Sequence, residues 1–292
     1  MGAESVNAAV DDDPLARRTG SAGGTAGLRP QSVMLTFLGN YVLGRDVAVF
    51  SGSFIDVFAR LGVSEHALRS TLTRMVGRGL LARHRRGRRM YFGLTERSAE
   101  ILRDGEARVW QRGPVNTDWD GTWTVLAFSL PESWQRQRHD LRARLVWSGF
   151  GALGNGMWIA PSGVDVGPVV DAPELAGRVK VFSGIAQPPT DVGQMVRDAF
   201  DLDGLVAGYS DFLLRWDMPD PVPDAPDDLV RYLRLLTEWL RLVRVDPRLP
   251  VQHLPADWPA ARAQDVVHQL RGRFEGPARE IVDRTCEIVE LG

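Results

Sequence analysis

The fold is decided by residues 64–94, which read SEHALRSTLTRMVGRGLLARHRRGRRMYFGL. Ser64 is placed to cap a helix, because a serine hydroxyl accepts hydrogen bonds from the free N–H groups of a first turn. We expect this helix to end at Gly77 or Gly79, where glycine lets the chain leave the helical conformation. Its apolar stripe, at helical spacing, consists of Leu68, Leu72, Met75 and Val76.

A basic hairpin follows in the same stretch. Residues 80–84 and 90–94 have the composition of two short strands, and Arg85-Arg86-Gly87-Arg88-Arg89 is expected to form the turn between them. Four arginines around one glycine give this turn a strong positive charge. The sequence therefore predicts a wing that meets phosphates or enters a minor groove.

Two more helices are predicted upstream. The first starts near Gln31, and the second has Ser51 or Ser53 as its possible N-cap, before a tight turn at Gly62-Val63. Three helices and an arginine-tipped hairpin, in this order, predict a winged helix-turn-helix at residues 28–95. The alternative is a three-helix structural domain with a solvated charged loop. The apolar stripes of the two helices are Met34, Phe37, Leu38 and Tyr41, and Phe54, Val57, Phe58 and Leu61.

Small polar and arginine side chains occupy the outward face of the third helix, and such a face suits the donor and acceptor pattern of a major groove. Those at positions 69, 70, 73 and 74 are candidates for base edges. The wing arginines are expected to contact backbone phosphates, which sets affinity and salt dependence rather than sequence choice. The candidate DNA-binding residues are Ser64, His66, Arg69, Ser70, Thr73, Arg74, Arg85, Arg86, Arg88 and Arg89.

Charge is unevenly distributed along the 292 residues, although the net charge is only −2. Residues 28–113 contain 15 Arg and 7 acidic residues, a net of +8, whereas residues 1–27 contain 2 Arg and 4 acidic residues, a net of −2. The remaining residues, 114–292, therefore carry −8. A basic domain joined to an acidic body indicates local contact with phosphates.

The composition favours a globular protein of the cytoplasm. The single cysteine, Cys286, excludes an internal disulfide framework and fits a reducing compartment. The chain has no run of 18 apolar residues, so no membrane span is expected. Residues 1–27, rich in Gly, Ala and Asp, are expected to be a disordered tail.

The middle of the chain predicts a small ferredoxin-like α+β domain, because its elements follow the order β-α-(β)-β-α-β. Strands are expected at 123–130, 157–160 and 179–185, with helices starting near Trp134 and at 164–175, and a loop at 149–156. That loop contains G-x-G-x-x-G. A dinucleotide site needs a strand before this motif and a helix after it, and here the order is reversed, so a hairpin or turn is expected instead.

The C-terminal part is expected to be all-helical. Helices are predicted at 202–216, at 229–243 and from 260 to 289, the last broken at Gly276-Pro277. Their apolar stripes could form core, a dimer face or an effector cavity. The predicted fold class is thus multidomain α+β. The expected parts are a tail at 1–27, the winged helix-turn-helix at 28–95, a connecting helix and linker at 96–118, the ferredoxin-like domain at 119–188 and a helical domain at 189–292.

No catalytic signature stands out. The sequence contains no G-x-x-x-x-G-K-[ST], H-E-x-x-H or G-x-S-x-G motif, and its five histidines are scattered without a Cys or carboxylate at ligand spacing. We therefore assign no catalytic residue, metal site or cofactor, and expect a protein that is not an enzyme.

The ordered pieces resemble the PaaX family of phenylacetic acid degradation repressors. The resemblance covers residues 29–290 and rests on three elements: residues 63–81 with the Arg-Arg-Gly-Arg-Arg wing, the central WDGTW at 119–123 with GFGALGNGMWI at 149–159, and DPRLP at 246–250 followed by LPADWP at 254–259. It implies a cytoplasmic homodimer that represses from a palindromic operator. It also implies an acyl-CoA effector, of the phenylacetyl-CoA type, whose binding releases DNA. Arg142 and Arg144 are candidates for the CoA phosphates.

Two alternatives remain open. One is an enzyme acting on nucleic acid or on a CoA thioester, which a ferredoxin-like middle domain would allow. The topology of that domain is also similar to a CRISPR-associated nuclease subunit. Such nucleases carry a metal-binding Asp at the end of the first strand, where this chain has Phe128-Ser129-Leu130-Pro131. The other alternative is a DNA-binding protein without an effector.

Overall fold

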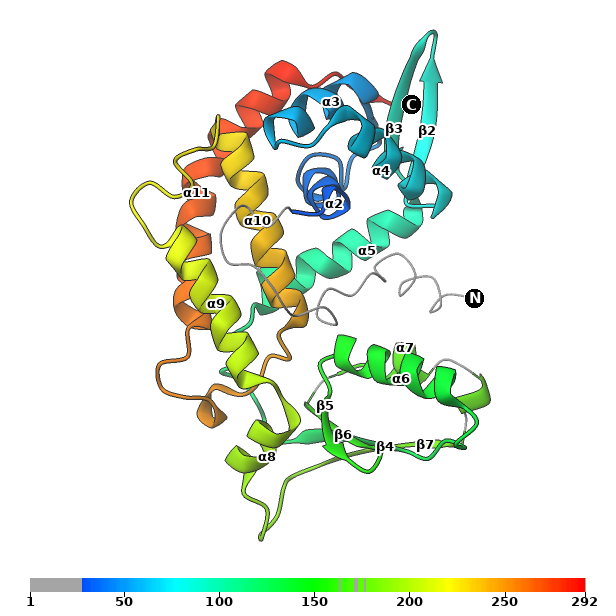
Figure 1. Ribbon diagram of the computed structural model, residues 1–292, viewed down its shortest axis with the longest axis vertical. Helices are drawn as coiled ribbons and strands as arrows, with labels where there is room; N and C mark the ends of the chain where they lie inside the picture. The colour runs from blue at the N-terminus through cyan, green and yellow to red at the C-terminus, as the bar shows by residue number, and fades with distance from the viewer. Residues whose placement is uncertain (1–27, 163, 171–172, 176, 292) are drawn as a thin grey trace. The chain divides into compact units, whose positions relative to one another are not determined.

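The computed structural model describes residues 28–162, 164–170, 173–175 and 177–291, so the tail expected at 1–27 lies outside the described residues. The chain divides into two compact units, which we describe separately (Figure 1). Within the described residues, the head unit comprises 28–108, 214–240 and 265–291, and the body unit comprises 109–213 and 241–264. Each unit contains a four-stranded antiparallel sheet together with helices, so the mixed α+β class is confirmed.

The head sheet has the strand order β2-β3-β1-β8. Its last strand comes from the C-terminal end of the chain, so the expectation that this end is all-helical is wrong. A strand of three residues is too short to produce a periodic signal. Its place follows from pairing, because the Phe50 N–H donates to the carbonyl of Glu287 and Val49 pairs with Ile288. The strands are β1 (Val47–Phe50), β2 (Leu81–Arg86), β3 (Arg89–Leu94) and β8 (Ile288–Glu290).

The three helices expected before the wing are present, but the predicted cap of the second helix is wrong. Phe50 is its N-cap residue, and neither Ser51 nor Ser53 caps it. Ser53 lies inside the helix, and its hydroxyl accepts a hydrogen bond of 2.9 Å from the Glu287 N–H. The helices of this region are α2 (Pro30–Tyr41), α3 (Ser51–Arg60), α4 (Glu65–Gly77) and α5 (Glu96–Glu106), the last continuing as a π-helical turn at Ala107–Arg112.

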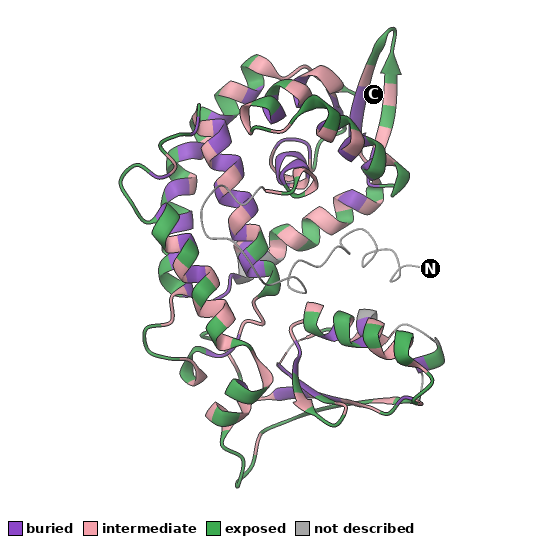
Figure 2. Ribbon diagram, viewed as in Figure 1, coloured by how far each residue is buried: buried purple, intermediate pink, exposed green. Residues whose placement is uncertain are grey.

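Three long helices near the C-terminus each contribute segments to both units, namely α9 (Leu202–Trp216), α10 (Asp228–Val245) and α11 (Ala260–Thr285). In the head unit Trp239 of α10, Phe274 of α11 and Phe37 of α2 are all fully buried. Figure 2 shows α2 and α10 with many buried residues. Full burial of one large apolar side chain contributes about 1.5–3 kcal/mol. The α2 and α10 helices also share a buried hydrogen bond of 2.9 Å between the hydroxyls of Thr36 and Thr237.

The break predicted at Gly276-Pro277 is also wrong, because α11 runs through it. A proline inside a helix costs about 3 kcal/mol. Here Gly276 and Pro277 are exposed, so a carbonyl that loses its helical partner can be hydrated. The opposite face keeps Phe274 and Ala278 buried on either side of the proline, and this packing maintains the helix. No helix in the described part of the chain is long and apolar enough to cross a membrane.

The body sheet has the order β5-β6-β4-β7 and carries α6 and α7 on one face (Figure 1). The expected loop at 149–156 contains the strand β5, the expected helix at 164–175 is reduced to α7 and a 3-10 turn at Pro173–Leu175, and α8 was not predicted. Short elements of this kind fall below the length at which periodicity is visible. The elements are β4 (Trp123–Phe128), α6 (Gln135–Trp147), β5 (Gly151–Gly154), β6 (Met157–Pro161), α7 (Gly167–Val170), β7 (Val179–Gly184), α8 (Val192–Ala199) and a 3-10 turn at Val251–His253.

The G-x-G-x-x-G string forms part of a hairpin, as the order of elements around it predicted. Gly154 pairs with Met157, which leaves Asn155 and Gly156 as the two-residue turn, both with positive φ. This is the conformation that a type I′ turn requires. A Cβ at Gly156 would lie 2.5 Å from the Phe128 carbonyl oxygen, so glycine is required there for space as well.

The DPRLP segment at 246–250 closes the end of α10 in the body unit. The Asp246 carboxylate accepts hydrogen bonds from the Tyr209 hydroxyl at 2.6 Å and from the Arg248 N–H at 2.7 Å. The Arg248 guanidinium in turn donates to the carbonyl of Gly113 at 2.7 Å. Burial nevertheless raises the pKa of Asp246 to about 6. The segment therefore builds a turn rather than a reactive site.

A raised pKa at Asp246 makes stability depend on pH. Between pH 4 and 6 the folded protein binds a proton at this carboxyl that the unfolded chain does not, so the unfolding free energy gains a contribution as the pH falls and loses it as the pH rises through 6. We expect Asp246→Asn, which is neutral at every pH, to remove about 1–3 kcal/mol of this change between pH 7 and 4.5. Urea unfolding of both proteins across this range measures it, and identical pH profiles would contradict the assignment.

Candidate nucleic-acid interface

The helix α4 presents its predicted outward face to solvent. The Ser64 hydroxyl caps it, accepting a hydrogen bond of 3.3 Å from the Ala67 N–H. Leu68 and Met75 are fully buried and fix the orientation of the helix on the head unit. The candidate side chains that this leaves exposed are His66, Arg69, Thr73 and Arg74, with Ser70 half-buried beside them.

The two arginines of this face, Arg69 and Arg74, make only weak side-chain contacts. Arg69 donates through Nε and a terminal nitrogen to Glu65 at 2.8 and 2.5 Å, but the two side chains are 66% and 55% exposed. An exposed pair one helical turn apart contributes about 0.3–0.5 kcal/mol. Arg74 makes contacts of 3.5 and 3.2 Å with the hydroxyls of Ser70 and Thr71. Both guanidiniums can therefore exchange these partners for a base edge or a phosphate at small cost.

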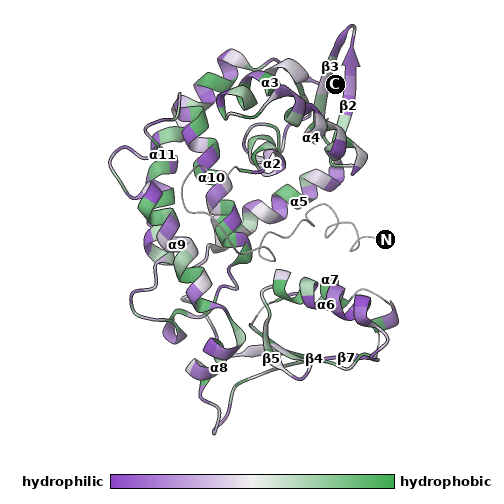
Figure 3. Cartoon of the chain, viewed as in Figure 1, coloured by the Kyte–Doolittle hydropathy of each residue, from purple (hydrophilic) through white to green (hydrophobic). Residues whose placement is uncertain are grey.

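The wing has a tighter turn than the sequence suggested. Arg86 pairs directly with Arg89, so the turn consists of Gly87 and Arg88 alone, and the expected five-residue turn is wrong. Gly87 has φ +61°, the sign that a type II′ turn requires at its first central position. The hairpin stays regular to its tip because glycine allows a two-residue connection. Figure 3 shows the outer part of β2 as hydrophilic.

The four wing arginines fall into two pairs. Arg85 and Arg88 are exposed near the tip, and the only side-chain hydrogen bond of Arg85 within the described residues, of 3.0 Å, goes to the carbonyl of Gly87. Arg86 donates to the carbonyl of Glu290, and Arg89 forms an ion pair with Glu287. The second pair is therefore already engaged by the C-terminal strand and the residue that precedes it.

Glu287 is a structural residue of the wing that sequence reasoning missed. Its carboxylate accepts hydrogen bonds from the Tyr91 hydroxyl and the Arg89 guanidinium, which lower its pKa. The Arg89 guanidinium also lies 5.2 Å from the centre of the Phe50 ring. The contacts of Glu287 join residues almost 200 positions apart, and no local pattern in the sequence could indicate them.

Charge in this region is strongly one-sided. Residues 64–94 contain eight Arg and one acidic residue, Glu65, a net of +7. They supply both the exposed face of α4 and the wing, which the structure brings together as parts of the head unit. Such a surface attracts a polyanion, and its combination of a helix and a hairpin suits a DNA duplex.

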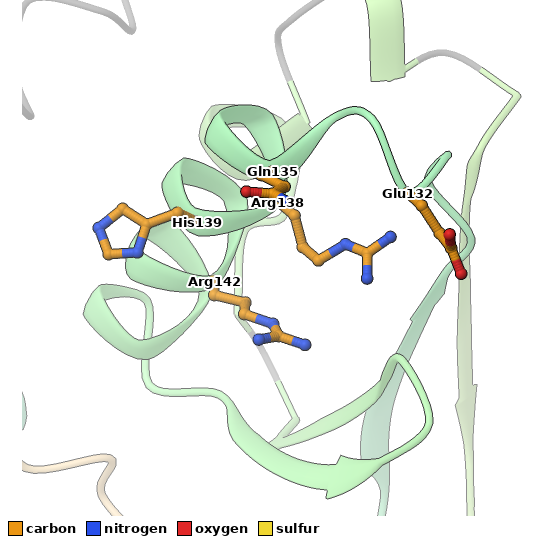
Figure 4. Close-up of a pocket in the computed structure, with 5 residues that line it drawn as sticks. All are labelled: Glu132, Gln135, Arg138, His139 and Arg142. Carbon is orange, nitrogen blue, oxygen red and sulfur yellow. The ribbon is translucent and has the colours of Figure 1, made fainter.

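A shallow groove of about 410 Å³ lies along α6 of the body unit. Arg138 and Arg142 extend to the same side of the helix, whereas His139 points away (Figure 4). Arg138 donates to the Leu130 carbonyl at 2.8 Å, and nothing in the described part of the chain holds the Arg142 guanidinium. Arg144, the other predicted effector residue, does not line this groove.

Arg142 also lines an adjoining hollow of about 200 Å³ under the β5–β6 hairpin. Apolar side chains of Met157 and Trp158 contribute to its wall. The two hollows together offer cationic groups at one end and an apolar surface at the other. No group of three or more His, Cys, Asp or Glu side chains among the described residues is arranged to hold a metal ion.

Three family models match successive parts of the chain. The model described as PaaX-like protein matches residues 29–98, the PaaX protein central Cas2-like domain matches 116–196, and the PaaX-like protein C-terminal domain matches 200–284. The chain is 27% identical over 271 residues to the transcriptional repressor PaaX of Escherichia coli strain K12, covering 88% of this chain and 84% of the repressor.

A solved structure supports the same relationship. The uncharacterized protein Rv0674 from Mycobacterium tuberculosis is 25% identical, with a TM-score of 0.61, and the match covers 87% of this chain and 98% of that chain. The three family models together span most of the residues from 29 to 284. The chain therefore belongs to the PaaX family.

Proposed function

We propose that this protein is a transcriptional repressor that recognises a specific DNA sequence through α4 and the wing. The observation that carries the proposal is the net charge of +7 on the single stretch 64–94, which supplies both the exposed helix face and the hairpin. Its likeness to a protein described as a transcriptional repressor supports regulation over catalysis. The order of α2, α3, α4 and the β2–β3 hairpin supports a winged helix-turn-helix.

The contacts divide by chemistry. In this proposal α4 lies in the major groove, with Arg69, Ser70, Thr73 and Arg74 near base edges and His66 beside them. The wing tip carries Arg85 and Arg88 to phosphates or into the adjacent minor groove, while Arg86 and Arg89 mainly brace the hairpin. Ser64 acts through the helix cap, because its hydroxyl is used there.

Selection of bound sequences from a random duplex pool tests DNA recognition directly. The proposal expects one enriched motif with twofold symmetry, because a dimer of this protein would read two half-sites about 34–36 Å apart or a multiple of that distance. Binding that is equally strong to every duplex would reduce the function to non-specific packaging. Absence of binding at low salt would refute it.

We further propose an effector with anionic and apolar parts, of the acyl-CoA class, that binds the groove along α6. Arg138 and Arg142 would meet the phosphates, and the hollow near Met157 and Trp158 would take the acyl group. The strand order β5-β6-β4-β7 supports a ferredoxin-like domain at residues 119–188 as the receptor of this ligand. Release of DNA requires that the effector bind two dimer geometries with different affinity.

A matched pair on α6 tests this groove. Arg142→Ala is expected to weaken binding of phenylacetyl-CoA by about 10-fold or more, because a hydrogen bond to a charged group contributes about 1.5–3 kcal/mol. Arg144→Ala, on the same helix but outside the groove, should bind as the wild type does. Calorimetric titration and the ligand-induced rise in melting temperature measure the difference. Equal losses in both variants would remove the groove from the proposal, and unchanged operator affinity across a panel of acyl-CoAs would favour an effector-independent regulator.

A further inference from the structure

Among the residues that the structure describes, the strand β7 is an open edge of the body sheet. The sheet order ends at β7, and five of its six residues are exposed (Figure 2). Val181, Phe182 and Ile185 are 39%, 61% and 63% exposed. Because neighbouring side chains of a strand point to opposite faces, Val181 and Phe182 place apolar surface on both sides of the edge. Soluble proteins normally protect such edges, so this one is expected to have a partner.

The register of β7 on β4 determines which backbone N–H and carbonyl groups of β7 do not bond to β4. In an antiparallel pair, residues directly opposite each other either exchange both hydrogen bonds or exchange none. The Ser129 N–H donates to the Arg178 carbonyl at 3.1 Å, one step beyond the pair Phe128–Val179. The even-numbered residues of β7 therefore bond to β4. The residues that direct their N–H and carbonyl groups away from the sheet are Val179, Val181 and Ser183.

We propose that this edge pairs antiparallel with the β7 edge of a second copy of the chain, joining the two sheets across a twofold axis. This inference deepens the proposed function, in which a twofold dimer binds DNA. The interface is argued from β7 itself, and only the role of the dimer in DNA binding rests on the proposed function. The outward-facing N–H and carbonyl groups of one strand must meet those of the other, so odd-numbered residues must lie opposite odd-numbered residues. In an antiparallel pair this places the twofold axis through a residue, not between two residues. We consider the registers centred on the three middle residues, Lys180, Val181 and Phe182.

Charge and strand length select among these registers. Centring on Lys180 would set two ammonium groups directly opposite each other, which is unfavourable. Centring on Phe182 would pair Val179 with Ile185, which lies beyond the end of β7. Centring on Val181 pairs Val179 with Ser183 and uses every outward-facing group of the strand.

The Val181 register also gives Lys180 a partner. It places each Lys180 opposite Phe182 of the other copy, where the lysine stem covers the ring and the ammonium can lie over its face. β7 carries no acidic residue, and Lys180 is the only lysine in the chain. A second copy of the same strand is thus complementary to β7 in backbone, charge and apolar surface.

Charge variants at one exposed position test both the interface and its register. Phe182→Lys places a lysine opposite Lys180 of the other copy. This like-charge pair occurs twice in the dimer because of the twofold axis, so dimerisation should weaken by at least about 10-fold. Phe182→Glu sets a carboxylate opposite Lys180 and should retain the dimer. If the axis passed through Phe182, the glutamates would oppose each other and this variant would dissociate as well. Sedimentation equilibrium of the full chain without DNA measures the association.

Further variants distinguish the loss of this interface from a general effect of added charge. Val146→Lys adds the same charge at another exposed apolar residue of the body unit and should leave the dimer intact.

Disulfide formation tests the register independently. In a Cys286→Ser background, Val181→Cys should form an intermolecular disulfide on mild oxidation, since the Cα atoms of two opposite residues in a hydrogen-bonded pair lie about 5.5 Å apart. Ser183→Cys should not, because its opposite residue is Val179. A Phe182→Lys dimer as tight as wild type would overturn the interface while leaving DNA recognition standing, and a monomeric wild-type protein would overturn it too.

Discussion

Replacing Arg85 and Arg88 together with alanine is expected to weaken binding to the operator and to unrelated DNA alike, by about 60-fold at 0.1 M salt. Both side chains are exposed near the tip of the hairpin. Each phosphate contact releases counterions, and its loss costs about 8-fold at this salt concentration. The slope of log K against log salt should become shallower by about 1.8. Fluorescence anisotropy over a salt series measures both quantities.

The control for this variant removes the same charge elsewhere. Arg103→Ala with Arg136→Ala takes two exposed arginines from α5 and α6, outside the proposed interface. Its affinity and salt slope should match those of the wild type. A loss confined to the operator would mean that the wing reads sequence, and an unchanged slope would mean that it does not touch phosphate at all. Arg86→Ala should have a smaller effect, because its guanidinium is engaged by the Glu290 carbonyl.

The second large effect is expected at α4 and should be specific to the operator. Arg69→Ala should reduce operator affinity by about 5- to 150-fold, the range for loss of about 1–3 kcal/mol from one base contact. The ion pair with Glu65 does not compete strongly, because it is exposed. Binding to scrambled DNA should change much less. Competition titrations with operator and scrambled duplexes separate the two.

Arg103→Ala serves as the matched control for Arg69→Ala, since it also breaks an exposed ion pair with a glutamate in the head unit. It should leave both affinities unchanged. Equal losses on operator and scrambled DNA in the Arg69 variant would instead assign that residue to a phosphate. Sequence choice would then belong to other residues of the helix face, beginning with Thr73.

The parts that sequence reasoning predicted well are those with local causes. Ser64 caps α4 as expected, since a cap needs only a hydroxyl at the first turn of an apolar-periodic stretch. The wing strands were visible from their composition and from the glycine between them. The hairpin at the G-x-G-x-x-G string followed from the order of elements, and the Asn155-Gly156 turn has the geometry such a pair favours.

What escaped prediction depends on residues far apart in the sequence. Glu287 braces Arg89 and Tyr91, and β8 completes the head sheet, only because α11 carries the C-terminus back to the first strand. The continuity of α11 through Pro277 likewise depends on which face of the helix is exposed. Helix-breaking rules ignore that context, whereas packing decides it.

Two of the segments that carry the family resemblance, WDGTW and DPRLP, have structural roles. In WDGTW, the Asp120 carboxylate accepts hydrogen bonds from the N–H and hydroxyl of Thr122, and Trp119 donates to the Thr122 carbonyl at 2.6 Å. In DPRLP, the Asp246 carboxylate accepts a hydrogen bond from the Tyr209 hydroxyl of α9, and Arg248 donates to the carbonyl of Gly113. These segments identify the family through how the body unit is built. They say less about the ligand that the body would sense.

Directed cleavage of bound operator DNA tests the central claim most directly. Cys286 is the single cysteine, so a Cys286→Ser background allows one iron chelate to be attached at Thr73→Cys on α4 or at Arg88→Cys on the wing. With protein at saturation, we expect the α4 probe to cut within each half-site and the wing probe to cut at displaced, flanking positions. Identical patterns from both probes, or saturated complexes that neither probe cuts, would contradict recognition by this helix and wing.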